Sequence, residues 1–505
     1  MDDLITTIAS PLPVLVFAVP IAFGAIILLA GRVCRWCREP LAFVGVLVTA
    51  ALGVQVAREA IAGRVLTGWG RLLYLDGLSA LMVLLGCLMG VAVILYSVRF
   101  IPYHLPEDQR TPRKLNLYYG LLLIFLGVLS LMCAANHIIL LYLSVEATTL
   151  ATALLIIYYW RRETLEAAYK YLILVGVGIT FALLGFVLLY VAGLQVLPGS
   201  EALLLTSLGQ IADKLPVNLA LLAAAFFVVG FGTKAGLMPF HAWLPDAHAE
   251  APTPISALLS GLVIKVGAYA LTRTITVLAP HYHAIVVFVA ILASAGMLLA
   301  IFMAWAQDDL KRLLAYHSVS QMGYIVEGLG LGTYLGIYGG LFHLLNHTLF
   351  KALLFMAVGA IMYATGGVRA ISRLGGLGRK MPITATCFFI GALAMGGVPL
   401  LNGFMSKLTL FIAVAEQRLL WAAVIGIMTS LLTLACMAHA AYRVFWGEAA
   451  DDSLAEVREA PATLLIPMIL LAALCVLLGL YPQAAYPLLD TAARSIVQAL
   501  GGAAH

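Results

Sequence analysis

The sequence predicts an all-α protein that crosses a membrane many times. Hydrophobic residues make up 63% of the 505 residues and charged residues only 10%, a balance that no water-soluble fold can bury. A helix that crosses a bilayer needs about 20 mainly apolar residues, and stretches of that length follow one another almost from end to end. They are continuous rather than alternately apolar and polar, which favours helices over a closed barrel because a helix satisfies its own backbone groups in lipid.

Fourteen spans can be placed on this pattern, all in one membrane domain covering residues 1–505. No hydrophilic stretch between them is long enough for a soluble domain. Three spans fall within 1–115, five within 116–275, five within 282–445 and the last within 460–505. In chain order they lie near 12–31, 41–57, 78–98, 116–134, 137–159, 168–194, 217–239, 253–272, 282–305, 314–332, 335–363, 383–415, 419–442 and 462–480.

The first span follows MDDLITTIAS, which lacks the basic n-region and small-residue cleavage site of a secretory signal, so we expect a retained helix. Lys and Arg gather in the loops after odd-numbered spans, for example at Arg110, Arg113 and Lys114. Cytoplasmic loops of membrane proteins carry such an excess of positive residues. The bias predicts odd-numbered loops in the cytoplasm and both termini outside.

Cofactor signals are weak throughout the chain. Only Cys34 and Cys37 have a motif spacing, and no further ligands lie nearby, so we expect two reduced thiols and neither a zinc nor an iron–sulfur site. The string GLGLG at 328–332 has no strand before it, which excludes a dinucleotide fingerprint. No basic patch supports a nucleic-acid partner.

A carboxylate lies deep in the fifth span, at Glu146 in LLYLSVEATTLATALLI. A buried ammonium needs a partner, and Glu146 is the only acid deep in the first half of the chain, so it predicts an ion pair with a buried lysine. The alternative is an interfacial Glu near a misplaced span boundary. Glu327, in GYIVEGLG of the tenth span, is either buried or at a helix end, and the sequence does not decide between the two.

The seventh and twelfth spans are interrupted, and each interruption carries a lysine. Glycine and proline free backbone groups that lipid cannot satisfy, so breaks belong where protein or water lines a cavity. The two spans are five helices apart and therefore cross in opposite directions, as in transporters built from inverted repeats. The breaking residues are Gly230, Gly232, Gly236 and Pro239 around Lys234, and Gly396, Gly397, Pro399 and Gly403 before Lys407.

Four lysines lie within predicted spans: Lys234, Lys265, Lys351 and Lys407. A charge at the bilayer centre costs at least about 2.5 kcal/mol, which predicts a function for these residues. Lysine suits ion relay because it can release its proton in a low-dielectric site, which arginine cannot. The alternative for each is an ammonium that reaches up to the headgroups, and it weighs most for Lys351.

The eleventh span carries His343, His347 and Lys351 at intervals of four residues, so the three should lie on one helical face over about 12 Å. Histidine titrates nearest neutrality, which predicts a proton wire. Structural histidines are the alternative, and a zinc site lacks further ligands.

The turn between spans seven and eight gathers His241, Asp246, His248 and Glu250, which either feed ions into the membrane or form a solvated turn.

Three long motifs resemble the antiporter-like family of complex I proton-pumping subunits, Mrp antiporter large subunits and membrane-bound hydrogenase subunits. They are FGTKAGLMPFHAWLPDAHAEAPTPISALLSGLVIKVGAYALTR, DDLKRLLAYHSVSQMGYI and FHLLNHTLFKALLF, within a resemblance over roughly 70–445. It implies two inverted five-helix repeats, spans four to eight and nine to thirteen. The second motif adds Asp309, Lys311 and His317 as accessory residues, and His317, where many members have serine, resembles hydrogenase-type chains.

The resemblance also implies roles for individual residues. Glu146 and Lys234 would be the controlling ion pair, Lys265 the central relay, His343 and His347 the connection, and Lys407 the lysine of the second half-channel. The chain ends soon after the fourteenth span, so we expect no long lateral helix of the kind found in the distal complex I subunit.

The expected function is that of a proton-translocating subunit of a hydrogenase-type or complex I-like assembly in a bacterial or archaeal cytoplasmic membrane. We expect no redox centre in this chain. Its partners would be homologous membrane subunits, peripheral subunits with iron–sulfur clusters, membrane lipid and H⁺, with Na⁺ left open. Alternatives within the class are an Mrp-type cation/proton antiporter subunit and a proton-channel subunit of inorganic-carbon uptake. A stand-alone transporter of an organic substrate would need a substrate cavity, and buried lysines argue against a structural scaffold.

Overall fold

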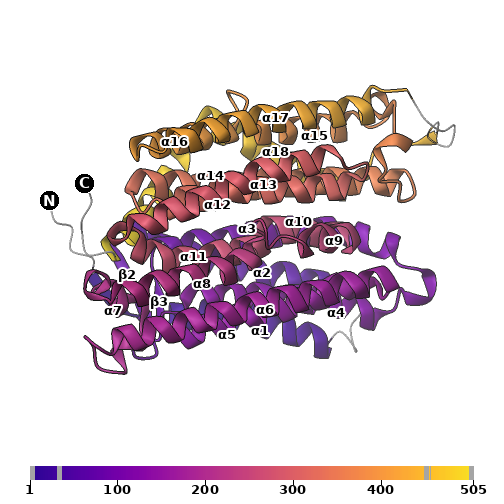
Figure 1. The fold of residues 1–505 in the computed structure, drawn as a ribbon. Helices are drawn as coiled ribbons and strands as arrows, with labels where there is room; N and C mark the ends of the chain where they lie inside the picture. Colours follow the sequence, from indigo (N-terminus) through magenta and orange to yellow (C-terminus); the bar gives the residue numbers. More distant parts are fainter. Residues whose placement is uncertain (1–5, 31–36, 449–453, 455, 500–505) are drawn as a thin grey trace.

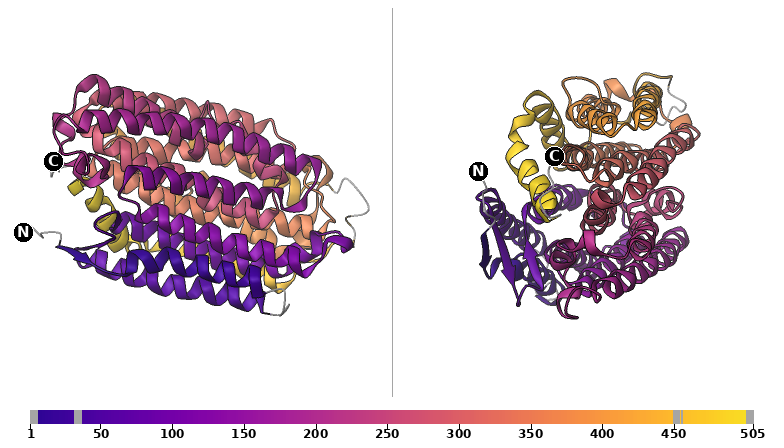
Figure 2. Two further views of the ribbon diagram at one scale, coloured as in Figure 1. Left: turned by 90° about the horizontal axis from the view of Figure 1, so that it is seen from below. Right: turned by 60° about the vertical axis from the view of Figure 1, so that its left-hand side comes forward.

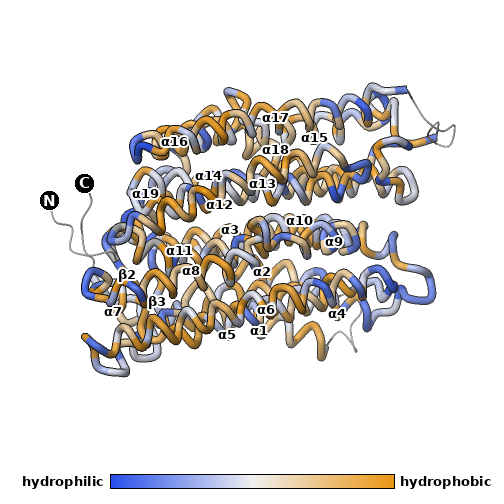
Figure 3. The backbone as a smooth tube through the Cα atoms, in the orientation of Figure 1, coloured by the Kyte–Doolittle hydropathy of each residue, from blue (hydrophilic) through white to orange (hydrophobic). Residues whose placement is uncertain are grey.

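The computed structural model describes residues 6–30, 37–448, 454 and 456–499. Long helices run side by side along one common direction (Figure 1). Among the described residues, twelve helices are long and apolar enough to cross a membrane. Hydrophilic residues gather at the two ends of the bundle and apolar ones along its length (Figure 3). The protein is a multi-pass membrane protein, as predicted.

The N-terminal part adds a small sheet that the sequence analysis did not predict. β1 pairs in parallel with β2, and β2 pairs with β3 in antiparallel fashion. The turn between β2 and β3 holds Trp69, Gly70 and Arg71 at positive φ. The elements are β1 (Thr6–Ala9), α1 (Leu12–Ala30), α2 (Arg38–Ile61), β2 (Arg64–Gly68), β3 (Leu73–Leu75) and α3 (Gly77–His104).

The next helices contain the first break. They are α4 (Pro112–Ala134), α5 (Ile138–Ile156), α6 (Arg162–Gly193), α7 (Leu205–Gly209), α8 (Val217–Ala235), α9 (Trp243–Glu250), α10 (Thr253–Leu258) and α11 (Ile264–Leu278). A π-helical turn, Leu259–Val263, joins α10 to α11 within the predicted eighth span. The predicted seventh span ends early, at Ala235, and the chain resumes as the short helix α9. This is the predicted interruption around Lys234.

The second half contains the other break. Its helices are α12 (His283–Trp305), α13 (Leu310–Gly330), α14 (Tyr334–Ala364), α15 (Pro382–Gly396), α16 (Asn402–Glu416), α17 (Leu420–Phe445), α18 (Ala462–Leu480) and α19 (Tyr486–Ala499). The predicted tenth span corresponds to α13, which is too polar to count among the twelve apolar helices. The predicted twelfth span is divided into α15 and α16, each only 15 residues long.

The two ends of the bundle differ. One end, here called the strand face, carries the three strands and α19; the other, here called the loop face, is where α4, α6 and α13 begin (Figure 1). Between them the core lies around α14 and the eighth span. The most apolar stretch of each of these two is completely buried, whereas only 33% of the corresponding stretch of α1 is buried. Helix α19 was not predicted. It packs against α3 and α14, beside α18, which contacts the same two helices (Figure 2).

One cysteine corrects the sequence analysis. Cys37, at the start of α2, is disulfide-bonded, so the expectation that it is a reduced thiol is wrong. Cys34, the other residue of that motif, lies outside the described residues. The expectation rested on the redox poise of the cytoplasm, an average over proteins that does not determine the state of one thiol.

Candidate functional site

Lys234 lies at the end of the first broken helix. Helix α8 stops there because Gly236 takes a left-handed conformation with φ 73°, which glycine adopts without strain. Trp243 donates its indole N–H to the freed carbonyl of Thr233 at 2.8 Å. The Lys234 side chain is completely buried. Its Nζ donates to the hydroxyls of Thr149 (2.9 Å) and Tyr171 (2.7 Å).

Glu146 does not contact Lys234, contrary to the expected ion pair. None of the ion pairs among the described residues joins the two. Thr149 lies three residues further along α5, on the same helical face, and takes the position next to the ammonium. The Glu146 side chain is only half-buried, where solvation stabilises a carboxylate without a lysine beside it.

Lys265 lies in the centre of the molecule and is completely buried. Its Nζ hydrogen-bonds to the carbonyl of Ser260 and to Nδ1 of His347 on α14. Ser260 belongs to the π-helical turn directly before Lys265, and such turns occur mostly as local bulges at functional sites. The turn therefore presents a backbone acceptor to the ammonium, and the contact with His347 joins the two halves of the chain.

The predicted stripe on α14 is buried along its whole length. His343, His347 and Lys351 each have no exposed surface, and the rings of the two histidines are 6.4 Å apart. His343 Nδ1 is 3.0 Å from Ser406 Oγ, and its Nε2 is 3.2 Å from Gln321 Oε1. Lys351 donates to the Leu314 carbonyl at 2.6 Å, so its ammonium does not reach up to the headgroups.

Lys407 repeats the surroundings of Lys234 at the second break. Helix α15 ends before Gly397, which has φ 77°. The Lys407 Nζ donates to the Met395 carbonyl (2.7 Å) and the Ser430 hydroxyl (3.0 Å), and it lies 4.8 Å from the Tyr324 ring centre. Each of the two lysines therefore has a hydroxyl partner, a tyrosine ring and a helix C-terminus, whose carbonyl end favours a cation.

Residues at the loop face form a charged network around α9. Asp246 pairs with Lys170 (3.0 Å) and Arg312 (2.8 Å). Arg369 links Glu250 (3.0 Å) to Asp309 (2.6 Å). The side chains of Asp246 and Glu250 are 23% and 21% exposed, so α9 is not simply a solvated turn.

Three accessory residues near this network point inward. Lys311 is buried and donates to the carbonyls of Ala249 (3.1 Å) and Ala251 (2.7 Å). His248 is fully buried against the Phe355 ring. His241 is half-buried, with its ring centre 6.1 Å from that of Tyr316.

Several buried polar atoms along this route have no hydrogen-bond partner among the described residues. They include both ring nitrogens of His248 and of His317, Nε2 of His347 and Nε2 of Gln321. Buried polar groups in native proteins are nearly all paired with protein or with ordered water. The route past these residues therefore has the chemistry of a hydrated path.

Glu327 settles the alternative left open by the sequence. It is 3% exposed and accepts a hydrogen bond from the Ser294 hydroxyl at 3.1 Å. It is therefore a buried carboxyl on α13 rather than a solvated one at a helix end. Among the described residues no three His, Cys, Asp or Glu side chains gather to hold a metal ion, and the absence of a cofactor stays a prediction.

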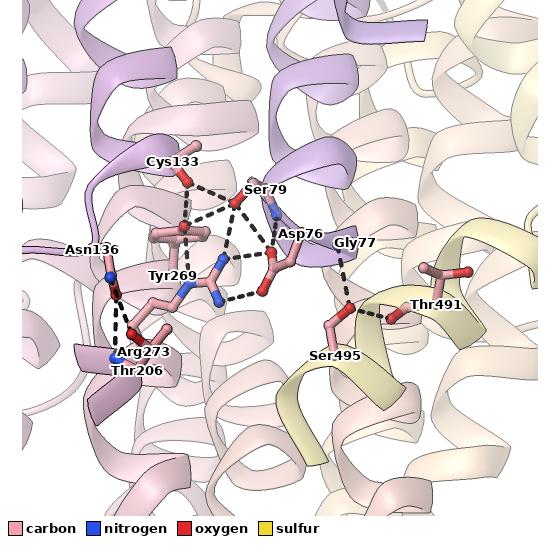
Figure 4. Close-up of polar contacts among 10 residues, drawn as sticks. All are labelled: Asp76, Gly77, Ser79, Cys133, Asn136, Thr206, Tyr269, Arg273, Thr491 and Ser495. Carbon is pink, nitrogen blue, oxygen red and sulfur yellow. Dashed lines mark hydrogen bonds and ion pairs between the residues drawn. The ribbon is translucent and has the colours of Figure 1, made fainter. Parts of the chain in front are cut away.

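The sequence analysis missed a second buried charge cluster, near the strand face (Figure 4). Arg273 on α11 donates to both carboxylate oxygens of Asp76, each at 2.6 Å. It also donates to Tyr269 OH and Ser79 Oγ, each at 2.9 Å. The spacing of Arg273, eight residues after Lys265, was the signal available, because it places both cations near one face of a helix.

Comparisons with known proteins agree with this arrangement. Residues 135–433 match the family described as NADH:quinone oxidoreductase/Mrp antiporter, TM. A hydrogenase-4 component F homolog of Methylacidiphilum infernorum is 36% identical over 389 residues, 76% of this chain and 81% of that protein. NADH-quinone oxidoreductase subunit N of Desulforudis audaxviator is 34% identical over 429 residues, 82% of this chain and 83% of that protein.

A solved structure extends the agreement to the whole fold. A chain of the membrane-bound sulfane sulfur reductase, an archaeal respiratory membrane complex, superposes with a TM-score of 0.85 at 26% identity, covering 97% of this chain and 98% of that one. The chain therefore belongs to the NADH:quinone oxidoreductase/Mrp antiporter family, as an antiporter-like subunit of the type found in complex I, Mrp and hydrogenase-type membrane complexes.

Proposed function

We propose that this chain carries protons along a row of buried side chains that runs across the helices, from Lys234 through Lys265, His347 and His343 to Lys407. The observation that carries the proposal is the hydrogen bond between Lys265 on α11 and His347 on α14. Without it, the lysines at the two helix breaks would lie in separate halves of the chain. With it, the half of the chain that carries Lys234 and the half that carries Lys407 are joined by a polar contact at the centre.

The central transfer uses the two nitrogens of His347. Nδ1 takes a proton from the Lys265 ammonium, and Nε2, which has no hydrogen-bond partner in the described part of the chain, releases one on the other side. A neutral imidazole carries out this exchange near neutral pH by changing its tautomer. The His343 ring is 6.4 Å away, a gap that one bridging water spans.

The second half takes over at His343. Its Nδ1 contacts the hydroxyl of Ser406, the residue directly before Lys407 on α16. Lys407 would then hold the proton beside the Met395 carbonyl and the Ser430 hydroxyl until it is released. Both lysines at the breaks rest on neutral partners, so either can gain or lose its proton without stranding a carboxylate in direct contact.

We place proton uptake at the loop face, where Asp246, Glu250, Lys311 and His248 lead inward. The excess of Lys and Arg at this face supports a cytoplasmic location, which leaves the strand face and both termini outside. Glu146 would act on Lys234 across the gap between them and meet it in another state of the cycle. Lys351 and His317 would tune the charge around the central transfer.

We further propose that this chain contributes no redox chemistry of its own and that the driving force comes from partner subunits. Homologous membrane subunits would lie beside it, and peripheral subunits with iron–sulfur clusters would supply electron transfer. The printed names of the relatives, a hydrogenase component and a quinone oxidoreductase subunit, support such an assembly. H⁺ is the proposed ion, since the row consists of groups that exchange protons, and lipid surrounds the outer helices.

The test is Lys265→Ala in the assembled complex, measured as proton pumping by membrane vesicles beside the content of the subunit. The substitution removes a buried charge, so the chain should insert and assemble, yet pumping should be lost. Lys214→Ala is the matched control, because Lys214 is exposed at the strand face and belongs to no part of the row. Normal pumping without Lys265 would overturn the proposal.

A further inference from the structure

The ion pair Asp76–Arg273 lies between the central lysine and the strand face. Helix α11 carries Lys265, Tyr269 and Arg273 at intervals of four residues, so all three share one face. The distance along the helix from Lys265 to Arg273 is about 12 Å. This face is therefore the shortest polar route from the centre of the proposed row to the surface at the strand face.

The route is interrupted directly after Lys265. The hydrogen bonds of the Lys265 ammonium go to the Ser260 carbonyl and to His347, and none among the described residues joins it to Tyr269. Tyr269 instead donates to the Cys133 carbonyl at 2.7 Å and accepts from Arg273 Nε at 2.9 Å. The side chains on the far side of the interruption are thus bonded to one another and not to the row.

Each side-chain nitrogen and oxygen of Arg273 and Asp76 has at least one hydrogen-bond partner in the cluster. The Asp76 carboxylate accepts two bonds from Arg273 and further bonds from the amide and hydroxyl of Ser79, and the Ser79 hydroxyl also reaches the Cys133 carbonyl at 2.7 Å. Figure 4 shows these contacts as one closed group. The cluster contributes no atom to the unpartnered buried polar atoms of the described residues, whereas His347, His317 and His248 all do.

The unpartnered polar atoms lie on the side of His347, and the partnered ones lie between Lys265 and the strand face. A polar group without a protein partner binds ordered water, and a chain of such waters conducts protons. A cluster in which each side-chain nitrogen and oxygen already has a protein partner binds water less readily. From Lys265, the lateral direction through His347 is open to a proton, and the direction toward the strand face is closed.

The chemistry of the Asp76–Arg273 pair also disfavours proton transfer from Lys265 to the strand face. A guanidinium keeps its proton at physiological pH, so Arg273 cannot pass a proton on. Burial alone would raise the pKa of Asp76, but the Arg273 guanidinium and the Ser79 hydrogen bonds more than offset it and hold that pKa below its ordinary value. Asp76 therefore stays ionised and holds Arg273 in place.

We propose that Asp76 and Arg273 form a proton seal that prevents Lys265 from leaking its proton to the strand face and directs it sideways to His347. The seal rests on the proposed function, since it has a task only if Lys265 carries protons. Neither residue would take part in the transfer itself; both are positioning residues that keep the shorter route closed.

The experiment measures passive proton leak in membrane vesicles that carry the whole complex and receive no electron donor. A pH step is imposed across the membrane, and its decay is followed with a pH-sensitive dye trapped inside. Arg273→Gln should make the decay several-fold faster per unit of subunit, while electron transfer with donor present is retained. Arg71→Gln is the matched control, because Arg71 pairs with Glu201 near the same face but is half-exposed, and its decay should equal that of the unmodified chain.

Two further variants make the result decisive. Lys265→Ala combined with Arg273→Gln should return the leak to the unmodified level, since the leak must pass through Lys265. If Arg273→Gln alone fails to assemble, Asp76→Asn with Arg273→Gln replaces the ion pair by two neutral amides and should leak in the same way. An unchanged decay in the assembled variants, or a leak that persists without Lys265, would overturn the seal. Loss of pumping in Lys265→Ala together with an unchanged decay in Arg273→Gln would overturn the seal alone, whereas intact pumping in Lys265→Ala would overturn the proposed function.

Discussion

At the scale of single residues, the lysines of the proposed row are stabilised by neutral oxygens and nitrogens rather than by carboxylates. Lys234 contacts two hydroxyls, Lys407 a carbonyl and a hydroxyl, and Lys265 a carbonyl and an imidazole. A carboxylate in contact would fix each charge strongly. Neutral partners leave the charge of the site adjustable, which a relay requires.

The first prediction concerns Lys234 and its two neighbours on α5. Double-mutant cycles on pumping rates should give a coupling of about 1 kcal/mol between Thr149→Val and Lys234→Met, because these side chains share a hydrogen bond. Glu146→Gln and Lys234→Met should also be non-additive if the pair meets during the cycle. Strict additivity of the Glu146 and Lys234 effects would remove Glu146 from the mechanism.

The second prediction concerns His347. Replacing it by Gln keeps a hydrogen-bonding side chain of similar size, so packing and subunit content should be preserved, but an amide cannot exchange protons near neutral pH. Pumping measured from pH 6 to 9 should therefore be lost throughout. His283→Gln, at an exposed position at the start of α12, is the control and should pump normally. Full activity of His347→Gln would make the histidine structural.

At the scale of elements, both helix breaks depend on a glycine in the left-handed conformation. Gly236 and Gly397 have φ values of 73° and 77°. At Gly397 an added Cβ would lie 3.1 Å from Cδ of Lys407 and 3.7 Å from its Nζ. Gly397 therefore packs directly against the Lys407 side chain, and a larger residue at position 397 would displace that side chain.

This contact gives the third prediction. Gly397→Ala should lower pumping markedly, because it adds backbone strain of about 1 to 2 kcal/mol and pushes a methyl group against the lysine. Gly366→Ala separates the two effects, since Gly366 has φ 68° but no atom within 4 Å of an added Cβ. It carries the strain without the contact. Equal pumping by the two variants, at matched subunit content, would show that the contact with Lys407 is irrelevant.

The sequence predicted the breaks but not every element. Gly and Pro beside a lysine within an apolar run are visible in the sequence, because both the freed backbone and the charge are costly in lipid. The π-helical turn at Leu259–Val263 has no such mark, since it contains a glycine but neither a proline nor a charged residue. The strands β1 to β3, of three to five residues, are too short to show an alternating pattern. Helix α19 lies outside any span and is fixed by its contacts with α3 and α14.

The site was predictable to the same extent. Lys265 and the stripe on α14 stand out because ionisable side chains within apolar runs are rare. Arg273 and Asp76 lie near span ends, where a charge is ordinary, and only the fold brings them together across 197 positions of sequence. The residues in direct contact with Lys234 were not predictable for a related reason. The sequence places Glu146 and Thr149 one helical turn apart, and only packing decides which of them meets the ammonium.

At the scale of the whole molecule, the charged groups lie in three places: at the loop face, at the strand face and in the buried row between the two faces. The loop face carries the Asp246 and Arg369 networks, the strand face carries the Asp76–Arg273 pair, and the row crosses the core around α14. On the proposed route, a proton that enters at the loop face would travel parallel to the membrane before it leaves. The membrane orientation therefore decides the direction of pumping.

The fourth prediction tests that orientation. Arg113 is exposed at the loop face and Lys214 at the strand face, and the excess of basic residues predicts a cytoplasmic location for the loop face. In intact cells, a membrane-impermeant thiol reagent should label Lys214→Cys, and it should label Arg113→Cys only after permeabilisation. The unmodified chain provides the background from its own cysteines. The reverse labelling would invert the topology and the direction of pumping.

The contact between α19 and the start of α3 has a consequence for biogenesis. The Ser495 hydroxyl accepts a hydrogen bond from the amide of Gly77, the residue after Asp76, across 418 positions of sequence, and α18 also packs on α3. During synthesis the chain emerges from its N-terminus, so α3 is inserted long before α18 and α19 exist. Contacts between such distant segments form late. The wall that holds Asp76 is thus completed only after α18 and α19 have been made, and these late helices then hold one of the early helices in place.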